Sequence, residues 1–243
     1  MPALDRLRSS GQVRCVPLEA RAGSGSTSGN VGREALEIVG PVSLPLALNG
    51  TEYLAKWYVA RKPEGDEQGV QPYEEVSVLQ FGGVESDGSR PLVRIHSACL
   101  TGDTLGSLRC DCGPQLRAAM HQIADGRSGG LLIYMTSHEG RGIGLWSKAA
   151  AYILQEEGLD TYEANRALGF EEDQRDFRMA VAVLRDRLGD RPIELLTNNP
   201  LKVKSLERFG VTDVRRRGLA EGASEHNRCY LRAKRDHGHL LPR

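Results

Sequence analysis

The sequence lacks the segments that mark membrane and secreted proteins. No apolar run approaches the roughly 18 residues of a membrane-spanning helix, and no secretory signal precedes the body of the chain. Cysteine is scarce, with five in 243 residues, and a chain of this length does not need disulfide staples. We therefore expect a cytoplasmic protein with no membrane partner.

The chain also lacks an excess of charge of either sign. Lys and Arg number 32 together, as do Asp and Glu, so the formal net charge is zero. A neutral chain has no overall electrostatic reason to bind nucleic acid, although local basic clusters can still hold a small polyanion. Walker A and dinucleotide-binding spacings are absent, as are internal repeats. The length suits one large domain or two small ones.

Three of the five cysteines are concentrated in one stretch. Cys99, Cys110 and Cys112 have the spacing C-x10-C-x-C. Three soft thiolates suit a tetrahedral zinc ion whose fourth position is left to water, which is the arrangement of a catalytic site. His96 is a candidate fourth ligand that would close the site. Inert buried thiols and a disulfide are the alternatives.

Hydrophobic patterning predicts a mixed fold of the α+β class, with helices around a β-rich core. Residues 1–35 hold Arg, Gly and Ser with little periodicity, and we expect a flexible tail, or else a lid or a partner-binding arm. A strand is expected at Glu52–Arg61, followed by a long hairpin formed by Val76–Gly82 and Leu92–Ala98.

The second half of the chain alternates between helical and strand patterns. A C-terminal βαβ unit is indicated by strand, helix and strand signals in succession. The expected elements are helices near 116–123, 146–153, 173–188 and 201–209, and strands at 131–134, 192–197 and 211–216. On the second helix we expect Trp146 and Ile153 to lie on the apolar stripe. Tyr152 lies on another face beside Lys148, as a site residue or a plain surface tyrosine.

Two loops have the composition of phosphate-binding turns. Glu139–Gly142 offers backbone N–H groups and a guanidinium before a helix, and Thr197–Lys202 offers a hydroxyl, a helix start and an ammonium. Ordinary turns are the alternative for each. In the 173–188 helix, Asp173 is a candidate general base whose pKa neighbouring acids would raise, and Arg175 is a candidate phosphate clamp. Acids that favour a helix start are the alternative.

Several of these segments, in the same order, closely resemble the GTP cyclohydrolase II family, whose members open the guanine imidazole ring at the entry to riboflavin synthesis. The resemblance covers residues from about 90 to 241 and rests on RIHSACLTGD, SLRCDCGPQL, HEGRGIGL, the DTYEAN–LGF–DQRDF stretch, LTNNPLKV and KRDHGHLL. It implies a GTP cyclohydrolase II-like catalytic domain over 36–243. The implied reaction converts GTP to 2,5-diamino-6-(ribosylamino)-4(3H)-pyrimidinone 5′-phosphate, formate and pyrophosphate.

The resemblance also implies roles for individual residues. Cys99, Cys110 and Cys112 match the zinc ligands; Asp173, Arg175 and Tyr152 match the proton acceptor, the proposed nucleophile at phosphorus and a tyrosine needed for ring opening. The positions that match GTP-binding residues are Arg94, His96, Ser97, Ala98, Gln115, Glu139, Gly140, Arg141, Thr161, Thr197 and Lys202. Magnesium is expected with the triphosphate, and the family is usually dimeric.

Two points of chemistry qualify the inherited roles. A guanidinium has a pKa above ~12 and no lone pair suited to attack phosphorus, so we favour Arg175 as a clamp. Ala98 stands where the family usually has Glu, and this change removes a carboxylate beside the metal. The alternatives to full hydrolysis are therefore a formylated product, a different purine nucleotide, or a zinc protein that binds GTP without turnover. A structural zinc protein on nucleic acid is a further alternative that the neutral charge disfavours.

Overall fold

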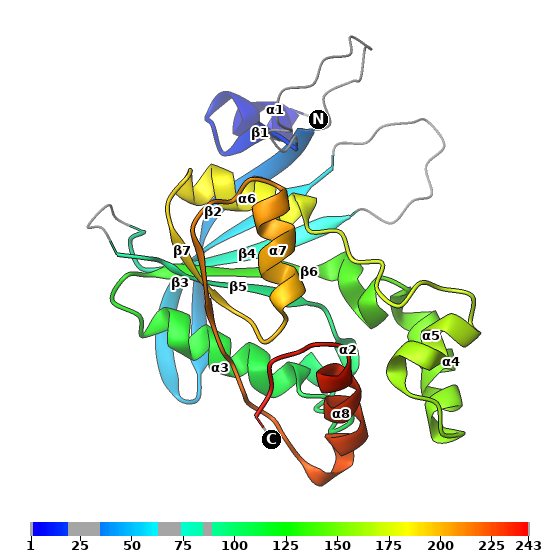
Figure 1. Ribbon diagram of the computed structural model, residues 1–243. Helices are drawn as coiled ribbons and strands as arrows, with labels where there is room; N and C mark the ends of the chain where they lie inside the picture. The colour runs from blue at the N-terminus through cyan, green and yellow to red at the C-terminus, as the bar shows by residue number, and fades with distance from the viewer. Residues whose placement is uncertain (1, 19–34, 63–73, 85–88, 243) are drawn as a thin grey trace.

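The computed structural model describes residues 2–18, 35–62, 74–84 and 89–242. Within these residues the chain forms one eight-stranded mixed sheet in the order β1-β2-β3-β4-β6-β5-β7-β8 (Figure 1). The strands are β1 (Val13–Pro17), β2 (Ala35–Leu48), β3 (Thr51–Arg61), β4 (Glu75–Phe81), β5 (Leu92–Ser97), β6 (Gly130–Met135), β7 (Ile193–Leu196) and β8 (Val214–Arg217). Pairing is antiparallel from β1 to β6 and parallel from β6 to β8.

Helices cover both faces of this sheet. The helices are α1 (Pro2–Ser9), α2 (Leu100–Asp103), α3 (Cys112–Ala124), α4 (Gly144–Glu156), α5 (Thr161–Ala167), α6 (Arg178–Leu188), α7 (Pro200–Arg208) and α8 (Arg228–Asp236), with 3₁₀ turns η1 (Thr136–Arg141) and η2 (Glu225–Asn227). Helices α6 and α7 pack on one face and α3 on the other (Figure 1). Among the residues described, no helix is long and apolar enough to cross a membrane.

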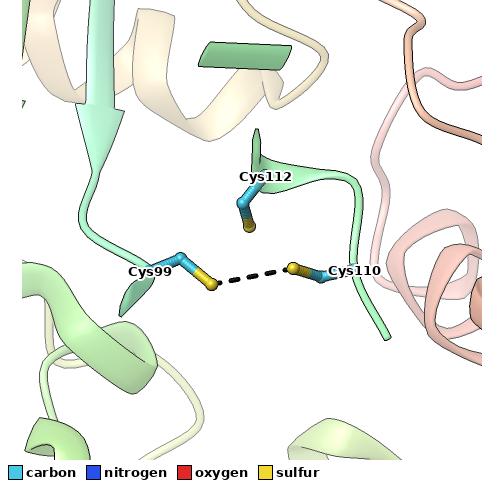
Figure 2. Close-up of side chains that lie close together, drawn as sticks. All are labelled: Cys99, Cys110 and Cys112. Atoms are coloured by element: carbon cyan, nitrogen blue, oxygen red, sulfur yellow. Dashed lines mark hydrogen bonds between the residues drawn. The ribbon is translucent and has the colours of Figure 1, made fainter. Parts of the chain in front are cut away.

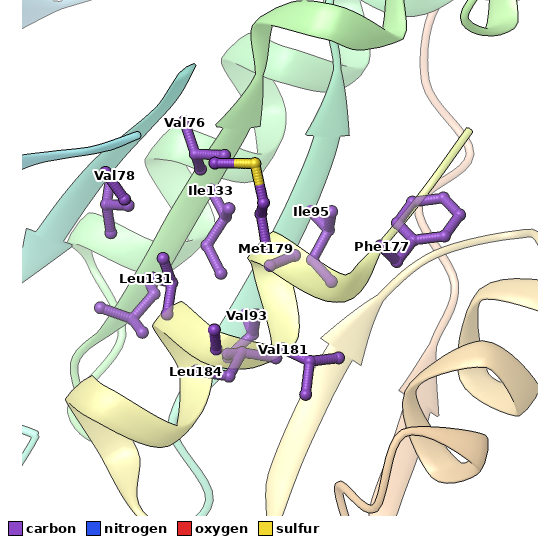
Figure 3. Close-up of a cluster of buried hydrophobic side chains, with 14 of the residues drawn as sticks. Val76, Val78, Val93, Ile95, Leu131, Ile133, Phe177, Met179, Val181 and Leu184 are labelled. Carbon is purple, nitrogen blue, oxygen red and sulfur yellow. The ribbon is translucent and has the colours of Figure 1, made fainter. Parts of the chain in front are cut away.

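The core follows from the alternation of side chains along the central strands. In β6, Leu131 and Ile133 face α6, whereas Leu132 faces α3, because successive residues of a strand point to opposite faces. Figure 3 shows Met179 of α6 lying over Ile133 in the larger cluster. A strand buried on both faces has a continuous apolar sequence. Burial of β6 and its parallel pairing with β5 bring the carboxyl ends of the two strands together.

The predicted α+β class and C-terminal βαβ unit are confirmed, with β7, α7 and β8 forming a parallel unit. The predicted long hairpin is wrong. Strand β6 lies between β4 and β5, antiparallel to the first and parallel to the second. Strands β4 and β5 are therefore not neighbours in the sheet, and β5 is placed in its parallel half.

Within the region 1–35, which the sequence predicts to be a flexible tail, the structure describes residues 2–18 and residue 35. Helix α1 precedes β1, and β1 pairs with β2 in antiparallel register. Arg14 of β1 also forms a two-bond ion pair with Asp186 of α6, with Nε 2.9 Å from Oδ1. Residues 19–34, which include the Gly- and Ser-rich run, lie outside the described residues. Strand β1 thus belongs to the same sheet as β2, and the domain boundary at residue 36 stays a prediction.

Two helix predictions need correction. The helix predicted over 173–188 begins at Arg178, because the side chains of Asp173 and Asp176 accept hydrogen bonds from backbone N–H groups two residues ahead and so favour turns. On α4 the predicted inward stripe faces solvent: Trp146 is 83% and Ile153 60% exposed, whereas Lys148 is buried. The two corrections concern the segments nearest to the cysteines and their cavity.

Candidate active site

The three cysteine sulfurs meet at the end of the parallel strands. Cys99 follows β5 after one residue, and Cys110 and Cys112 lie where the chain enters α3. The sulfur atoms all lie within 4.8 Å of one another, and those of Cys99 and Cys110 are 3.6 Å apart (Figure 2). All three are free thiols, so the disulfide alternative is wrong.

The space and the donors at this cluster fit a metal ion. A β-carbon on Gly102 of α2 would come within 2.7 Å of the Cys110 sulfur and 3.2 Å of the Cys99 sulfur, so only glycine leaves room there. Hydrogen bonds from Cys110 and Cys112 lower the pKa of the Cys99 thiol, and the charge of Lys148 adds to that shift. Thiolate is the form that binds zinc.

His96 does not belong to this donor set. Its Nε2 lies 3.1 Å from both carboxylate oxygens of Asp103, and Asp103 also accepts from the Cys99 backbone N–H and the Tyr134 hydroxyl, each at 3.0 Å. Burial lowers the pKa of His96. Among the described His, Cys, Asp and Glu residues, the cluster holds the three cysteines alone. His96 as a closing fourth ligand is therefore wrong, and a tetrahedral ion held by the three cysteines would keep its fourth position for solvent or substrate.

Lys148 of α4 lies between the cluster and a carboxylate. Its ammonium donates to the Cys99 sulfur at 3.2 Å and to Glu139 Oε1 at 2.5 Å. The other carboxylate oxygen, Oε2, accepts from the Leu100 backbone N–H at 2.7 Å. Burial opposes the charge of Lys148, but the hydrogen bond to Glu139 and the charge of Cys99 outweigh it and raise the pKa of Lys148.

Tyr152 lies one turn beyond Lys148 on the same face of α4. Its hydroxyl is 3.3 Å from Thr101 Oγ1, and the Arg109 guanidinium lies 4.3 Å from its ring centroid. Burial raises the pKa of Tyr152, so the phenol keeps its proton at neutral pH. The alternative of a plain surface tyrosine is wrong, because the ring lines the same cavity as the sulfurs.

A buried polar chain runs from α8 to the sheet through α3. Lys234 donates to Asp111 Oδ1 at 2.6 Å, and Gln115 donates through Nε2 to Asp111 Oδ2 at 2.6 Å. Arg94 in turn donates to Gln115 Oε1 at 2.8 Å and to the Leu196 carbonyl at 2.9 Å. Since a carboxylate only accepts and a guanidinium only donates, the amide of Gln115 has a single allowed orientation.

The glycine-rich loop places a guanidinium over the start of α5. Arg141 has a positive φ of 66°, which is uncommon outside glycine. Its guanidinium lies 3.6 Å from the ring centroid of Tyr162, the residue after Thr161. Gly140 precedes it with φ 61°, and a β-carbon there would lie 3.1 Å from that of Lys148. The loop thus packs tightly on α4 while it directs Arg141 away from it.

Asp173 and Arg175 form a bidentate ion pair, and Arg175 also reaches the Ser97 hydroxyl at 3.3 Å. Burial favours a higher pKa for Asp173, but the hydrogen bonds and charge of Arg175 outweigh it, so that the pKa of Asp173 is lowered. The expected increase from neighbouring acids is therefore wrong, because the nearest charge is a cation.

The second predicted phosphate loop forms the start of α7. Asn199 caps the helix by accepting from the Leu201 N–H at 2.9 Å, and Thr197 Oγ1 accepts from the Asn199 N–H at 3.0 Å. Lys202 is buried and donates to the Ile95 carbonyl at 2.9 Å. Burial, with Arg175 and Arg94 nearby, lowers the pKa of Lys202 well below its usual value. A polyanion would relieve this clustering of cations.

One cavity collects these groups. Its space, including the open mouth, is about 1020 Å³. Every residue predicted as a ligand, as substrate-binding or as catalytic lines it except Asp173, which contacts it through Arg175. Among the described residues, several of its side chains hold buried polar atoms without a protein partner; these are Arg94 Nε, His96 Nδ1, Arg141 NH1, Asn165 Nδ2 and His239 Nδ1. Such atoms suit a polar ligand.

Comparison with known proteins identifies the family of this chain. A family model described as GTP cyclohydrolase II matches residues 64–217. The chain belongs to the GTP cyclohydrolase II family. It is 52% identical over 158 residues to the GTP cyclohydrolase-2 of Neisseria gonorrhoeae, covering 64% of this chain and 78% of that protein. It is 47% identical over 188 residues to the GTP cyclohydrolase-2 of Neisseria meningitidis, covering 76% of this chain and 91% of that protein.

Longer relatives share the same region. The chain is 55% identical over 157 residues to the riboflavin biosynthesis protein RibBA of Bacillus subtilis, covering 63% of this chain and 38% of that protein. The match thus spans about two fifths of the length of the RibBA relatives. Such proteins are similar to this GTP cyclohydrolase II family member only in that part of their length.

The cavity has walls that no sequence pattern had assigned. His138 lies 3.2 Å from the Ser97 hydroxyl, and burial lowers the pKa of His138 to about 4. Tyr230, Lys234 and His239 of the C-terminal segment also line it, beyond the end of the family match at residue 217. A signal existed for the last two: KRDHGHLL resembles the family's closing segment, but the resemblance carried no role for it.

Proposed function

We propose that the protein is a zinc-dependent GTP cyclohydrolase II. It hydrolyses GTP to 2,5-diamino-6-(ribosylamino)-4(3H)-pyrimidinone 5′-phosphate, formate and pyrophosphate. The observation that carries the proposal is the opening of a three-cysteine site onto a cavity lined by Arg94, Arg141 and Lys202, which can accept a triphosphate. Family membership supports the same reaction.

The metal would be held by Cys99, Cys110 and Cys112. Zinc, when bound with an open position, supplies a Lewis acid that lowers the pKa of a coordinated water toward ~7. Loss of C8 as formate takes two additions of water, and the three cysteines that would hold the metal line the cavity where the base would lie. Magnesium would accompany the triphosphate and share its charge with the cavity's cations.

The base and the triphosphate need different partners. Glu139 can accept from N1–H and the 2-amino group of guanine, because both are donors and a carboxylate only accepts. Gln115 keeps one N–H and one lone pair free after its bonds to Asp111 and Arg94, so it can also pair with the base. Thr161 and Thr197 also line the cavity and carry hydroxyl groups that can bind the nucleotide.

Proton and phosphoryl transfer fall to a separate group. Tyr152 keeps its proton, since burial raises its pKa, and can donate it during ring opening. Asp173 stays ionised beside Arg175 and can accept a proton. Arg175, held by that carboxylate, clamps the transferring phosphoryl group, while His96, Ser97, Ala98 and Gly140 shape the pocket around the nucleotide.

The test is incubation of the purified protein with GTP and Mg²⁺, with mass identification of the pyrimidine and assay of formate. Cys112→Ser should abolish product and lower bound zinc, whereas Cys229→Ser, at an exposed cysteine outside the site, should change neither. Binding of GTP with no release of formate in zinc-loaded protein would refute the proposed reaction.

Ala98 supports a second candidate outcome. The residue before Cys99 has no carboxylate, and its backbone N–H is used by the Met135 carbonyl at 3.1 Å. A reaction that stops after the first addition of water would release the formylamino-pyrimidine, with a mass larger than that of the full product by one CO unit. If the formyl product accumulates, Ala98→Glu should convert it to free formate; a variant that leaves the product unchanged argues against this origin.

We also propose that the protein forms a homodimer through the outer face of α4. Leu145, Trp146 and Ile153 expose 47%, 83% and 60% of their surface on that helix, and exposed apolar side chains that gather on one helix are typical of an association surface. The resemblance to a usually dimeric family supports a second copy as the occupant. Sedimentation velocity should show a dimer, and Trp146→Glu should shift it to monomer. A wild-type monomer at micromolar concentration would refute the proposal.

A further inference from the structure

One buried cation joins two parts of the site that otherwise come from separate segments. Lys148 is held on α4, Glu139 on η1 and Cys99 on the loop after β5. The Lys148 side chain is 8% exposed and that of Glu139 13%. The ammonium contacts the Cys99 sulfur at 3.2 Å and Glu139 Oε1 at 2.5 Å.

We propose that Lys148 is a positioning residue that fixes the charge of the metal site and the orientation of the base-reading carboxylate together. The inference rests on the proposed function, since it assigns the cysteines to a metal and Glu139 to guanine. Lys148 acts through Cys99 and Glu139 and is not required to touch the substrate.

The first half of the argument is electrostatic. Three thiolates, one divalent cation and the Glu139 carboxylate would carry a net charge of −2, which the adjacent ammonium lowers to −1. An N–H group that donates to a ligand sulfur also withdraws electron density from it, so the thiolate gives less to the metal. Partners of this kind typically change metal affinity or activity by about 10- to 100-fold when they are removed.

The second half concerns the carboxylate. Glu139 is held at both oxygens, by Lys148 and by the Leu100 backbone N–H at 2.7 Å. Two fixed donors define the plane of the carboxylate, and its remaining lone pairs are left for a ligand. Without Lys148 the group keeps one anchor and can rotate. Guanine, which donates from N1–H and from the 2-amino group, then no longer meets two acceptors in a fixed orientation.

The backbone around Lys148 is built to bring the pieces close. A β-carbon on Gly140 would lie 3.1 Å from the Lys148 β-carbon and 2.9 Å from a side-chain carbon of Ile143. The positive φ of Gly140 and Arg141 lets the chain turn directly after Glu139. Tight packing of this loop on α4 keeps the distance between ammonium and carboxylate short.

The metal readout does not depend on turnover. Cobalt(II) would be loaded into wild type and into Lys148→Met, Lys148→Arg and Ser147→Ala, and the thiolate-to-cobalt charge-transfer band recorded. Loss of the donor raises the energy of the sulfur lone pair, so Lys148→Met should move the band to longer wavelength and change metal affinity in chelator competition by about 10-fold or more. Lys148→Arg should largely retain the band position and the metal affinity of wild type. Ser147→Ala, at the neighbouring residue, should retain both in full.

The substrate readout tests the carboxylate. Inosine triphosphate lacks the 2-amino group, so wild type should prefer GTP by kcat/KM. Lys148→Met should raise KM for GTP about 10-fold more than KM for inosine triphosphate, which lowers the preference by that factor. Lys148→Arg should restore it in part.

The outcomes separate the inference from the function on which it rests. An unchanged cobalt band and metal affinity in Lys148→Met overturn the assignment to the metal site, and an unchanged preference for GTP overturns the assignment to Glu139. If Lys148→Met does not fold by circular dichroism, Lys148→Gln and Lys148→Arg give the same comparison. Wild type that binds cobalt through sulfur but never processes GTP refutes the proposed function while the band still tests Lys148.

Discussion

Asp111→Asn tests whether the protein fixes the orientation of Gln115. Asp111 is 1% exposed and accepts from Lys234 and Gln115, both at 2.6 Å. It forces the Gln115 Nε2 toward itself and leaves Oε1 for Arg94 at 2.8 Å. Asparagine offers a donor as well as an acceptor, so the amide of Gln115 gains a second orientation in which it repels Arg94.

The structure sets the size of two separate effects. A hydrogen bond to a charged group contributes about 1.5–3 kcal/mol, and about 1.4 kcal/mol is tenfold in affinity. If this bond orients Gln115 for the base, KM for GTP should rise about 10- to 100-fold. Removing one partner of a buried ion pair costs about 3–5 kcal/mol. Since the Lys234 side chain retains 13% exposure, we expect about 2–3 kcal/mol of unfolding free energy to be lost.

The assay combines steady-state kinetics with urea unfolding of zinc-loaded protein. Lys234→Met and the double variant complete a cycle, in which the double variant should be more stable than the sum of the single losses predicts. Asp125→Asn is the matched control, because Asp125 follows the last residue of the same helix and its carboxylate accepts an exposed hydrogen bond from the Tyr53 hydroxyl. Additive losses, or an unchanged KM in Asp111→Asn, would refute the reasoning.

Two further predictions follow from the same site. Gly102→Ala places a methyl group 2.7 Å from the Cys110 sulfur. Because overpacking of this kind costs about 1–3 kcal/mol, zinc affinity in chelator competition should fall about tenfold, whereas Gly218→Ala should leave it unchanged. Full zinc affinity in Gly102→Ala would contradict the proposed metal site. Asp173→Asn should be less stable than wild type, because Arg175 lowers the pKa of Asp173. The difference in unfolding free energy should be constant between about pH 5 and pH 8 and should become smaller below about pH 4. Urea midpoints of the two proteins that converge near pH 6 would contradict this prediction.

The metal site could be predicted because its information is local. The spacing of Cys99, Cys110 and Cys112 specified three thiolates on one segment, and the fold brings them within 4.8 Å. His96 could not be excluded in the same way. Its partner Asp103 is seven residues away on α2, and only the geometry of that helix turns the carboxylate toward the ring. Spacing gives the set of donors, but side-chain direction decides which of them face the ion.

The order of the strands could not be read from the chain. Strands β4 and β5 are adjacent in sequence and equally apolar, so a hairpin was the local expectation. Strand β6 follows β5 by more than thirty residues and nevertheless inserts between the two, because a parallel neighbour buried under α3 and α6 covers more apolar surface. The cavity walls supplied by Lys234 and His239 were missed although KRDHGHLL resembles the family's closing segment, because contacts between distant segments leave no periodic signal that would assign these residues a role.

Helix α4 shows where amphipathic reasoning reverses. Its apolar residues Trp146 and Ile153 face outward, and its lysine and tyrosine face inward. The usual rule assumes that a helix covers a hydrophobic core, whereas α4 covers a cavity of thiolates, carboxylates and cations. Lys148 can be buried there because its positive charge offsets the negative charges of the Cys99 thiolate and the Glu139 carboxylate. On this helix the polar face is buried and the apolar face is exposed, which indicates a site on one side and a partner on the other. The proposed dimer and the proposed role of Lys148 both follow from this orientation of α4.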